Sequence, residues 1–559
     1  MKILTVFKYE FLSVKNFVSY GGWARKLVVI LFFIVISFVS VGIFAFFIKI
    51  FEFISSQEQG LQVLTFYSVA AAFFLIFGLL IVSNALFLSG QLFSFRGNNN
   101  LISFPLSPIQ IFFIKFIPAV FFASWPIYVV GIPTILALLF TFDSSLFTLV
   151  GAILLLSPLV FIALSWSTIL VFVLNALIGK LTFRFILILA AVLLFILSSF
   201  TVNTLFPNNI ELIFETLDKV QARETLLSFA IFSDLLPSAW FTKGIWGLVE
   251  PTTNLFLGSL VLLWLLSFVS FLLVLILVRI FYLPLLQKTQ EGALIASPSS
   301  PESFRKISPV KFSHLIVGNL IKKEVTTLFR DSRRMSYFWF LLLIMTIYFF
   351  ALLRVPDLNS LEPSFAGFIL AGNFSFIAYF QTILGLKFAY PSMSMEGKSA
   401  WVLWSLPIRL DRILRSKALV FIPGIILVGL TMNFVSGVMF SYNLFLWWTS
   451  LTFSLIVGAF VSSIALSFGT FFPSFDETDQ DAASTSAPGL LATALSLLTV
   501  ASFSFVLWNF YNGYFFLRFS DTFNAQPVLD FIIVSGVYTA AMIWFLFFFA
   551  GRKLKSYDF

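Results

Sequence analysis

The chain has 559 residues, of which 60% are hydrophobic and 11% charged, and its formal net charge is +9. Soluble domains carry about 25% charged residues, so this composition excludes a soluble globular protein and indicates an integral membrane protein. The chain contains no cysteine, which excludes disulfides and thiolate metal sites.

The positive charge is distributed as membrane topology requires. Residues 287–334 contain nine Lys or Arg and four Asp or Glu, whereas residues 206–250 contain three and six. Because Lys and Arg are enriched in cytoplasmic loops, we expect the first region inside and the second outside, with both termini in the cytoplasm. This distribution points to membrane lipids as partners and not to nucleic acid.

Apolar runs long enough to cross a bilayer, about 20 residues each, recur along the chain. The first six fall roughly at 27–50, 64–93, 110–141, 146–178, 182–205 and 255–283. The second six fall roughly at 335–354, 364–389, 418–440, 443–471, 488–511 and 527–551. In lipid no water is present to bond the backbone N–H and C=O groups, so these groups must bond to each other. Each run is therefore predicted to be a helix. The expected fold is an all-α integral membrane protein with 12 transmembrane helices in two parallel six-helix repeats.

The repeats predict the domain organisation. Residues 1–284 form the first unit, with an outer helical loop at about 206–253, and residues 314–559 form the second. Residues 285–313 are rich in Ser and Pro and are predicted to be a flexible cytoplasmic linker.

Local patterns add detail within each unit. Ile210–Leu217 has the spacing of an amphipathic outer helix, and Trp240 and Phe241 suit an aromatic belt at the membrane interface. Each unit opens with a basic, partly apolar segment, Phe7–Phe11 and Ile321–Val325. Both segments are typical of interfacial helices on the cytoplasmic leaflet, and topogenic charge is the alternative interpretation.

Two stretches between the second and third runs of each unit match without a gap, Arg96–Lys115 and Lys398–Lys417. The identical pairs are Ser103 with Ser405, Pro105 with Pro407, Ile111 with Ile413, and Lys115 with Lys417. A polar, proline-broken segment present twice at one topological position predicts a duplicated docking surface, so we call these the docking stretches. An ordinary basic loop is the alternative for a single copy. The candidate docking residues are Arg96, Leu101, Pro105, Lys398, Trp401, Trp404, Pro407, Arg409, Asp411 and Arg412.

The third run of each unit begins beside its docking stretch. Ser107 and Pro108 are predicted as the N-cap and first-turn proline of the helix in the first unit. In the second unit Leu410, Ile413 and Leu414 share one apolar helical face.

Ionisable residues are nearly absent from mid-membrane positions. Lys115 and the other cations lie toward the ends of the runs, where long side chains can reach the interface. The polar residues within the runs include amides expected to bond between helices, namely Asn84, Asn175, Asn373, Gln381 and Asn433. Ion-coupled transporters carry buried carboxylates or histidines, so any work done by this chain is expected to be powered from elsewhere.

Three features that resemble sites have simpler explanations. His314 is the only histidine and has no ligand neighbours. Ser392–Ser399 ends like a nucleotide-binding P-loop but lacks the first glycine and a preceding strand. The acidic run Asp476–Asp481 is typical of a solvated loop, although clustered carboxylates can hold a divalent cation. No catalytic, cofactor-binding or metal-binding residue is assigned.

The S-x-P-x-x-x-x-x-I-x-x-x-K pattern of the docking stretches resembles the cytoplasmic coupling segment of type-2 ATP-binding-cassette (ABC) exporter permeases. The interfacial segments and the outer loop also resemble elements of that family. The resemblance implies two fused permease units with interface and coupling helices, located in a bacterial inner (plasma) membrane. It also implies two copies of a cytoplasmic ABC ATPase subunit as partners. ATP and Mg²⁺ would then act through that subunit, and this chain would be a transport permease and not an enzyme.

The cargo and two other functions stay open. A path without charges suits an apolar or amphipathic cargo moved outward. A major-facilitator-like secondary transporter is the first alternative, although the glycines of its repeated loop motif are missing around Asp411 and Arg412. The second alternative is an intramembrane lipid- or polymer-modifying enzyme that uses Asp476, Glu477, Asp479 and Asp481.

Overall fold

A computed structural model gives the fold. It describes residues 23–56, parts of 73–93, 106–142, 146–178, 236–249, 253–295, 315–330, 332–352, 358, 363–405, 410–473, 475, 486–517 and 526–554. Every regular element within these residues is helical. The predictions for Phe7–Phe11, Ile210–Leu217, His314 and Asp476–Asp481 lie outside them.

Seven helical segments in the described part of the chain are long and apolar enough to cross a membrane. They are Thr148–Val173, Thr253–Gln287, Ala366–Gly397, Asp411–Met439, Leu444–Phe471, Pro488–Phe516 and Leu529–Leu554. Shorter apolar helical segments include Phe33–Lys49 and Tyr337–Phe349. The helical membrane fold is therefore as expected, while the count of twelve spans and the repeat arrangement stay predictions.

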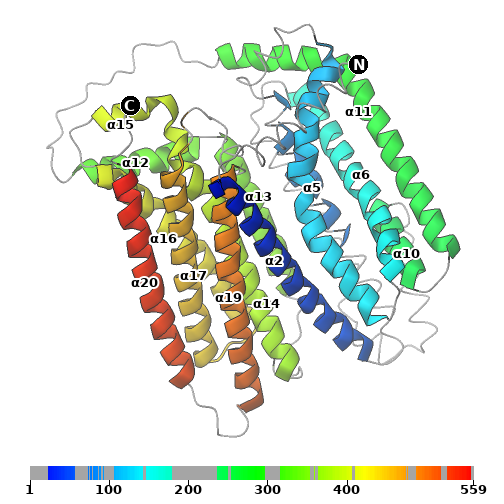
Figure 1. The fold of residues 1–559 in the computed structure, drawn as a ribbon. Coiled ribbons are helices and arrows are strands. Elements are labelled where there is room, and N and C mark those ends of the chain that lie inside the picture. The colour runs from blue at the N-terminus through cyan, green and yellow to red at the C-terminus, as the bar shows by residue number, and fades with distance from the viewer. Residues whose placement is uncertain are drawn as a thin grey trace. The chain divides into compact units, whose positions relative to one another are not determined.

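The chain divides into two compact units, the first mainly Ser40–Ser303 and the second mainly Phe304–Phe559. The first unit contains α5 (Pro108–Thr141), α6 (Leu146–Ile178), α10 (Pro237–Val249), α11 (Thr253–Ile295) and the part of α2 (Trp23–Ser56) from Ser40 onward. Helix α6 packs against α5, α10 and α11 (Figure 1). Helix α11 continues to Ile295, beyond the end of the predicted sixth run, because QKTQEGALI has few residues that disfavour a helix.

The core of the first unit is built from side chains of these helices. Leu155 of α6, Phe112 of α5 and Tyr282 of α11 are fully buried. The hydroxyl of Tyr282 donates to the carbonyl of Leu92 at 3.2 Å, which satisfies its polar atom inside the apolar core.

The predicted aromatic belt at Trp240 and Phe241 is wrong for Phe241. This side chain is fully buried, and its ring centroid lies 4.5 Å from that of Phe73. Helix α10 packs on α6 and α11, so one of its faces enters the core. In the sequence Phe241 stands beside residues typical of the membrane interface. That context does not reveal that its helix packs against α6 and α11.

The second unit is a helical bundle with α17 at its centre. Its helices are α12 (Leu315–Arg330), α13 (Ser332–Leu352), α14 (Pro363–Leu384), α15 (Ala400–Ser405), α16 (Leu410–Met439), α17 (Leu444–Phe471), α19 (Ala487–Leu517) and α20 (Gln526–Leu554). Helix α17 contacts α14, α16, α19 and α20. Helix α12 contains the predicted segment Ile321–Val325 and lies across the end of the bundle at which α16 begins (Figure 1).

Three of the five predicted amides bond between helices of the second unit, which confirms that expectation for them. The bonds run from Asn373 Nδ2 to Ser436 Oγ (3.2 Å), from Gln381 Nε2 to the Ser454 carbonyl (3.3 Å) and from Asn433 Nδ2 to the Ser450 carbonyl (3.3 Å). Asn175 bonds instead within its own helix, to the Val171 carbonyl at 2.9 Å. Asn84 is buried, and its Nδ2 has no partner among the described residues.

Candidate functional site

Helix α14 does not end as a simple α-helix. After α14 the chain continues as a π-helix, η2 (Gly385–Ala389), and two 3₁₀ helices, η3 (Tyr390–Ser392) and η4 (Ser394–Ser399). Pro391 lacks a backbone N–H, and Gly397 has a φ of 56°, a conformation that glycine adopts without strain. We call Gly385–Ser399 the bent segment. Short π-helical turns are frequent at functional sites.

A cluster of four charged side chains joins the bent segment to two helices. Lys417 of α16 places its Nζ 2.8 Å from Glu324 Oε1 of α12 and 2.8 Å from Glu396 Oε1 of the bent segment. Its third bond goes to the Ser392 carbonyl oxygen at 2.9 Å. Lys323 of α12 donates to the other carboxylate oxygen, Glu396 Oε2. We call these four side chains the charge cluster.

Burial makes the pairing in the charge cluster essential. The side chain of Lys417 is 0% exposed, and those of Glu324 and Glu396 are 6% and 10% exposed. Two ammonium and two carboxylate groups give the cluster no net charge. An ammonium has three donors, and all three of Lys417 are used. Removing Lys417 alone would leave two buried carboxylates with Lys323 as their only cation in the cluster, which is destabilising.

The bent segment is also held against the rest of its unit. The backbone of α17 approaches it at Gly469, where a Cβ atom would overlap the Tyr390 carbonyl. The hydroxyls of Tyr390 and Ser486, just before α19, lie 3.2 Å apart. Lys387 lies 4.8 Å from the centroid of the Tyr337 ring of α13. The bent segment therefore connects α12, α13, α16, α17 and α19.

The structure positions part of the second docking stretch. Lys398 lies in η4, Trp401 and Trp404 lie in α15, and Asp411 and Arg412 lie in the first turn of α16. Arg96, Leu101, Pro105, Pro407 and Arg409 lie outside the described residues. A carboxylate oxygen of Asp411 lies 3.9 Å from Arg415, one turn along α16. The docking role of these residues stays a prediction.

Helices α5 and α16, which begin within the two docking stretches, start at matched positions. Helix α5 starts at Pro108, and the predicted cap is confirmed: Gln110 N donates to Ser107 Oγ at 3.3 Å, and Ser107 N donates to Gln110 Oε1 at 3.0 Å. Helix α16 starts at Leu410, which is opposite Pro108 in the ungapped alignment. Helices α5 and α16 thus begin at the same point of their docking stretches.

The identical residues of these helices face inward. Ile111 and Ile413 are 2% and 1% exposed, and Lys115 is 9% exposed. The expectation that Lys115 extends to the interface is therefore wrong, because the helix turns it toward the interior of the first unit. In the described part of both docking stretches, identity marks buried packing positions and not exposed contact residues.

Sequence reasoning missed Glu324, Glu396 and the partners of Lys417. A signal was present for Lys417, because it follows Ile413 by one turn on the apolar face of α16. A lysine on such a face needs a buried partner. In the sequence Glu396 stands within a degenerate P-loop match, and this residue lies in a 3₁₀ helix that follows a long apolar helix.

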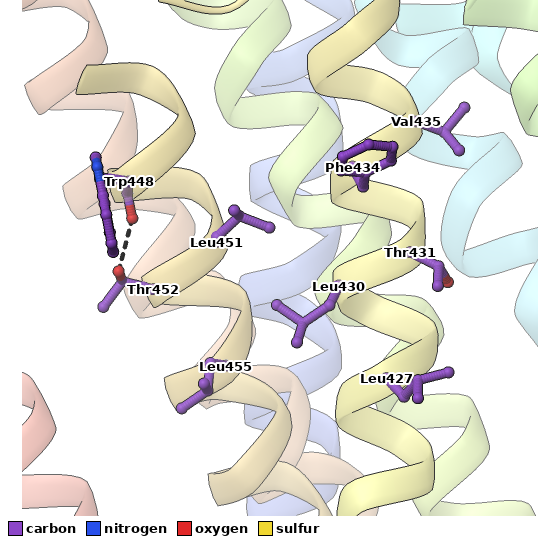
Figure 2. A pocket seen from close by; sticks show the side chains of 9 residues that line it. All are labelled: Leu427, Leu430, Thr431, Phe434, Val435, Trp448, Leu451, Thr452 and Leu455. Atoms are coloured by element: carbon purple, nitrogen blue, oxygen red, sulfur yellow. Dashed lines mark hydrogen bonds between the residues drawn. The ribbon is translucent and has the colours of Figure 1, made fainter. Parts of the chain in front are cut away.

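A separate apolar groove lies between α16 and α17, about ten residues along α16 from Lys417. Its volume is about 650 Å³, and its lining is Leu427, Leu430, Thr431, Phe434, Val435, Trp448, Leu451, Thr452 and Leu455 (Figure 2). Both threonine hydroxyls donate to carbonyls of their own helices, those of Val428 and Trp448. Because the groove lies on two candidate membrane spans and has no free hydroxyl donor, it suits the acyl chains of lipids.

Comparison with known proteins gives one match. A family model described as "Putative ATP-binding cassette" matches residues 23–559. Searches of curated proteins and of solved structures found no match. In the described residues no group of three or more His, Cys, Asp or Glu side chains could hold a metal ion.

Proposed function

The chain belongs to this ATP-binding cassette family, and we propose that it is the membrane permease of an ABC exporter whose ATPase subunits are separate proteins. The observation that carries the proposal is that one family model covers both apolar units, residues 23–559. This membership argues against the facilitator and enzyme alternatives.

ATP hydrolysis in a partner is supported by the sequence around the P-loop match. The only such match, Ser392–Ser399, lacks the first glycine, and Glu396 within it is paired with Lys417 and Lys323. A phosphate-binding loop follows a strand and presents free backbone N–H groups. We therefore assign ATP and Mg²⁺ to two cytoplasmic ATPase subunits, one docked on each docking stretch.

An apolar or amphipathic cargo is supported by the charge content of the candidate spans. Three of them, Thr148–Val173, Leu444–Phe471 and Pro488–Phe516, contain no Asp, Glu, Lys or Arg. An ionic cargo passing such helices would lose hydration without gaining a partner. We propose that the cargo path involves the first and fifth spans of each unit, which include α13 and α19 in the second unit.

Purification of the tagged chain from its native membranes tests the ATPase partnership. We expect a protein with Walker motifs to co-purify and to hydrolyse ATP. Charge reversal at Arg409 and Arg412 together should release it while the permease remains folded. Single reversals should do little, since exposed ion pairs contribute about 0–1 kcal/mol each. Retention of the ATPase by the double reversal, and by its combination with Arg96→Glu, would contradict docking at these stretches.

The cargo class is tested in reconstituted vesicles that contain the permease and its ATPase. Lipid-linked and hydrophobic compounds should stimulate ATP hydrolysis, and small hydrophilic ions should not. Stimulation by a hydrophilic ion alone would refute the apolar path while leaving the ATPase partnership intact.

A further inference from the structure

We infer that Lys417 is a positioning residue: by binding Glu324 and Glu396 together, it fixes the second docking stretch on its unit. The inference depends on the proposed function for the nature of the docked partner. The fixed distance between α12 and the docking stretch can be tested without any partner protein.

The first argument is where the charge cluster lies along the chain. Glu396 comes just before the candidate docking residues Lys398–Arg412, and Lys417 comes just after them. The 2.8 Å ion pair between Glu396 and Lys417 joins residues 21 apart and so closes this segment at its base. Closing a segment restricts the conformations open to it. The docking residues are therefore presented from a fixed base.

The second argument is that α12 joins the same ammonium group. Glu324 is 93 residues from Lys417 in sequence, yet their charged atoms lie 2.8 Å apart. Leu320, one turn before Glu324, is also buried, so this face of α12 packs on the unit. The charge cluster thus joins α12 to the residues on both sides of Lys398–Arg412 at one point. We expect α12 and these residues to move as one body.

The third argument is that charged side chains occupy this site, although apolar side chains could also join α12 to the docking stretch. Replacing buried ion pairs by apolar residues is often neutral or stabilising. An ammonium with three acceptors from Glu324, Glu396 and Ser392 has a defined orientation, whereas apolar surfaces can slide. Replacing the three buried members of the cluster together should therefore leave the fold stable while it loosens the position of the docking stretch.

Spin-label distances test the position directly. The chain has no cysteine, so Thr326→Cys on α12 and Ser405→Cys on α15, both at exposed positions, can be labelled uniquely in the full chain. The pulsed-EPR distance distribution should be narrow with the cluster intact and should broaden or shift with Lys417→Met. A second pair, Thr431→Cys and Ser502→Cys, reports on the bundle and should not change.

Glu396→Gln covers the case in which Lys417→Met disturbs the whole bundle. This variant leaves Lys417 paired with Glu324, so we expect a changed distance between Thr326 and Ser405 and an unchanged bundle pair. An unchanged distance in both variants would overturn the inference. A change in the bundle pair with Glu396→Gln would overturn it too, because the cluster would then support the whole unit and not the position of one segment.

ATPase recovery links the position to docking. In the triple variant Glu324→Gln, Glu396→Gln, Lys417→Met, which replaces the three buried members of the charge cluster and leaves the more exposed Lys323, the permease should reach the membrane in normal amount. The ATPase recovered with it should fall about tenfold or more, whereas the matched control Lys553→Met, at the exposed end of α20, should retain it. Normal ATPase recovery with the triple variant would overturn the inference. If the unaltered chain recovers no ATPase, the proposed function fails, while the spin-label result still stands.

Discussion

Replacing Gly429 with alanine tests how closely α14, α16 and α17 pack in the second unit. A Cβ atom at Gly429 would overlap the Nε2 and Cδ atoms of Gln381 and lie 3.0 Å from its Cγ. Gln381 has no room to move toward α17, because its Nε2 already lies close to Gly458. A Cβ atom built at Gly458 would be 2.5 Å from this Nε2. The fully buried amide is therefore held between two glycines on facing helices.

The expected loss of stability has two parts. Overpacking a tight site costs about 1–3 kcal/mol, and displacing Gln381 from the Ser454 carbonyl removes a hydrogen bond that contributes about 0.5–1.5 kcal/mol. Gly429→Ala should therefore lower the free energy of unfolding by about 1.5–4.5 kcal/mol. In a unit of this size each kcal/mol shifts Tm by about 2–4 °C, so the midpoint should fall by several degrees.

The assay is thermal denaturation of the purified chain in detergent, with the folded fraction at each temperature measured by size-exclusion chromatography. Gly424→Ala is the matched control on the same helix, because nothing lies within 4 Å of a Cβ there, and it should not lower the midpoint. Combining Gly429→Ala with Gln381→Ala should recover part of the loss, since the overlapping amide is gone. Equal midpoints for the two glycine variants, or no recovery in the double variant, would refute the packing argument.

Three further outcomes follow from the same structure and sequence. Gly469→Ala should lower the midpoint more than the control does, because its Cβ would overlap the backbone carbonyl of Tyr390, which no side-chain rotation can relieve; an unchanged midpoint would contradict this close approach. Asn373→Leu should cost about 1–3 kcal/mol in thermal stability, because buried hydroxyl groups would lose their partner, and a neutral effect would argue against the bond. In intact cells an impermeant thiol reagent should label a cysteine placed at Asp218 but not at Ser299; the reverse pattern would invert the topology.

The sequence alone determined the helical membrane character of the protein and the positions of several helices in the described part of the chain. Helix α17 spans Leu444–Phe471 where the apolar run was placed at 443–471, and α6 spans Leu146–Ile178 where it was placed at 146–178. These agreements have a local cause. A backbone in lipid must satisfy its own hydrogen bonds, so an apolar run of sufficient length forms a helix whatever its neighbours are.

The sequence also determined part of the candidate site. The cap predicted at Ser107 and Pro108 located the start of α5, whereas α16 begins at Leu410, before the apolar run predicted at 418–440. Helical periodicity placed Ile413 on an inward face, which its burial confirms. These features depend only on residues within a few turns of one another.

Only the tertiary structure decided which partners these residues meet. Lys417 takes one carboxylate from α12 and another from the bent segment, at separations of 93 and 21 residues. Phe241 enters the core because α10 packs on α6 and α11. Such contacts depend on how separate helices pack, and the periodicity of one helix carries no information about which helix lies against it. A charged residue on a buried face therefore indicates that a partner of opposite charge exists. The packing of the bundle determines which residue is that partner.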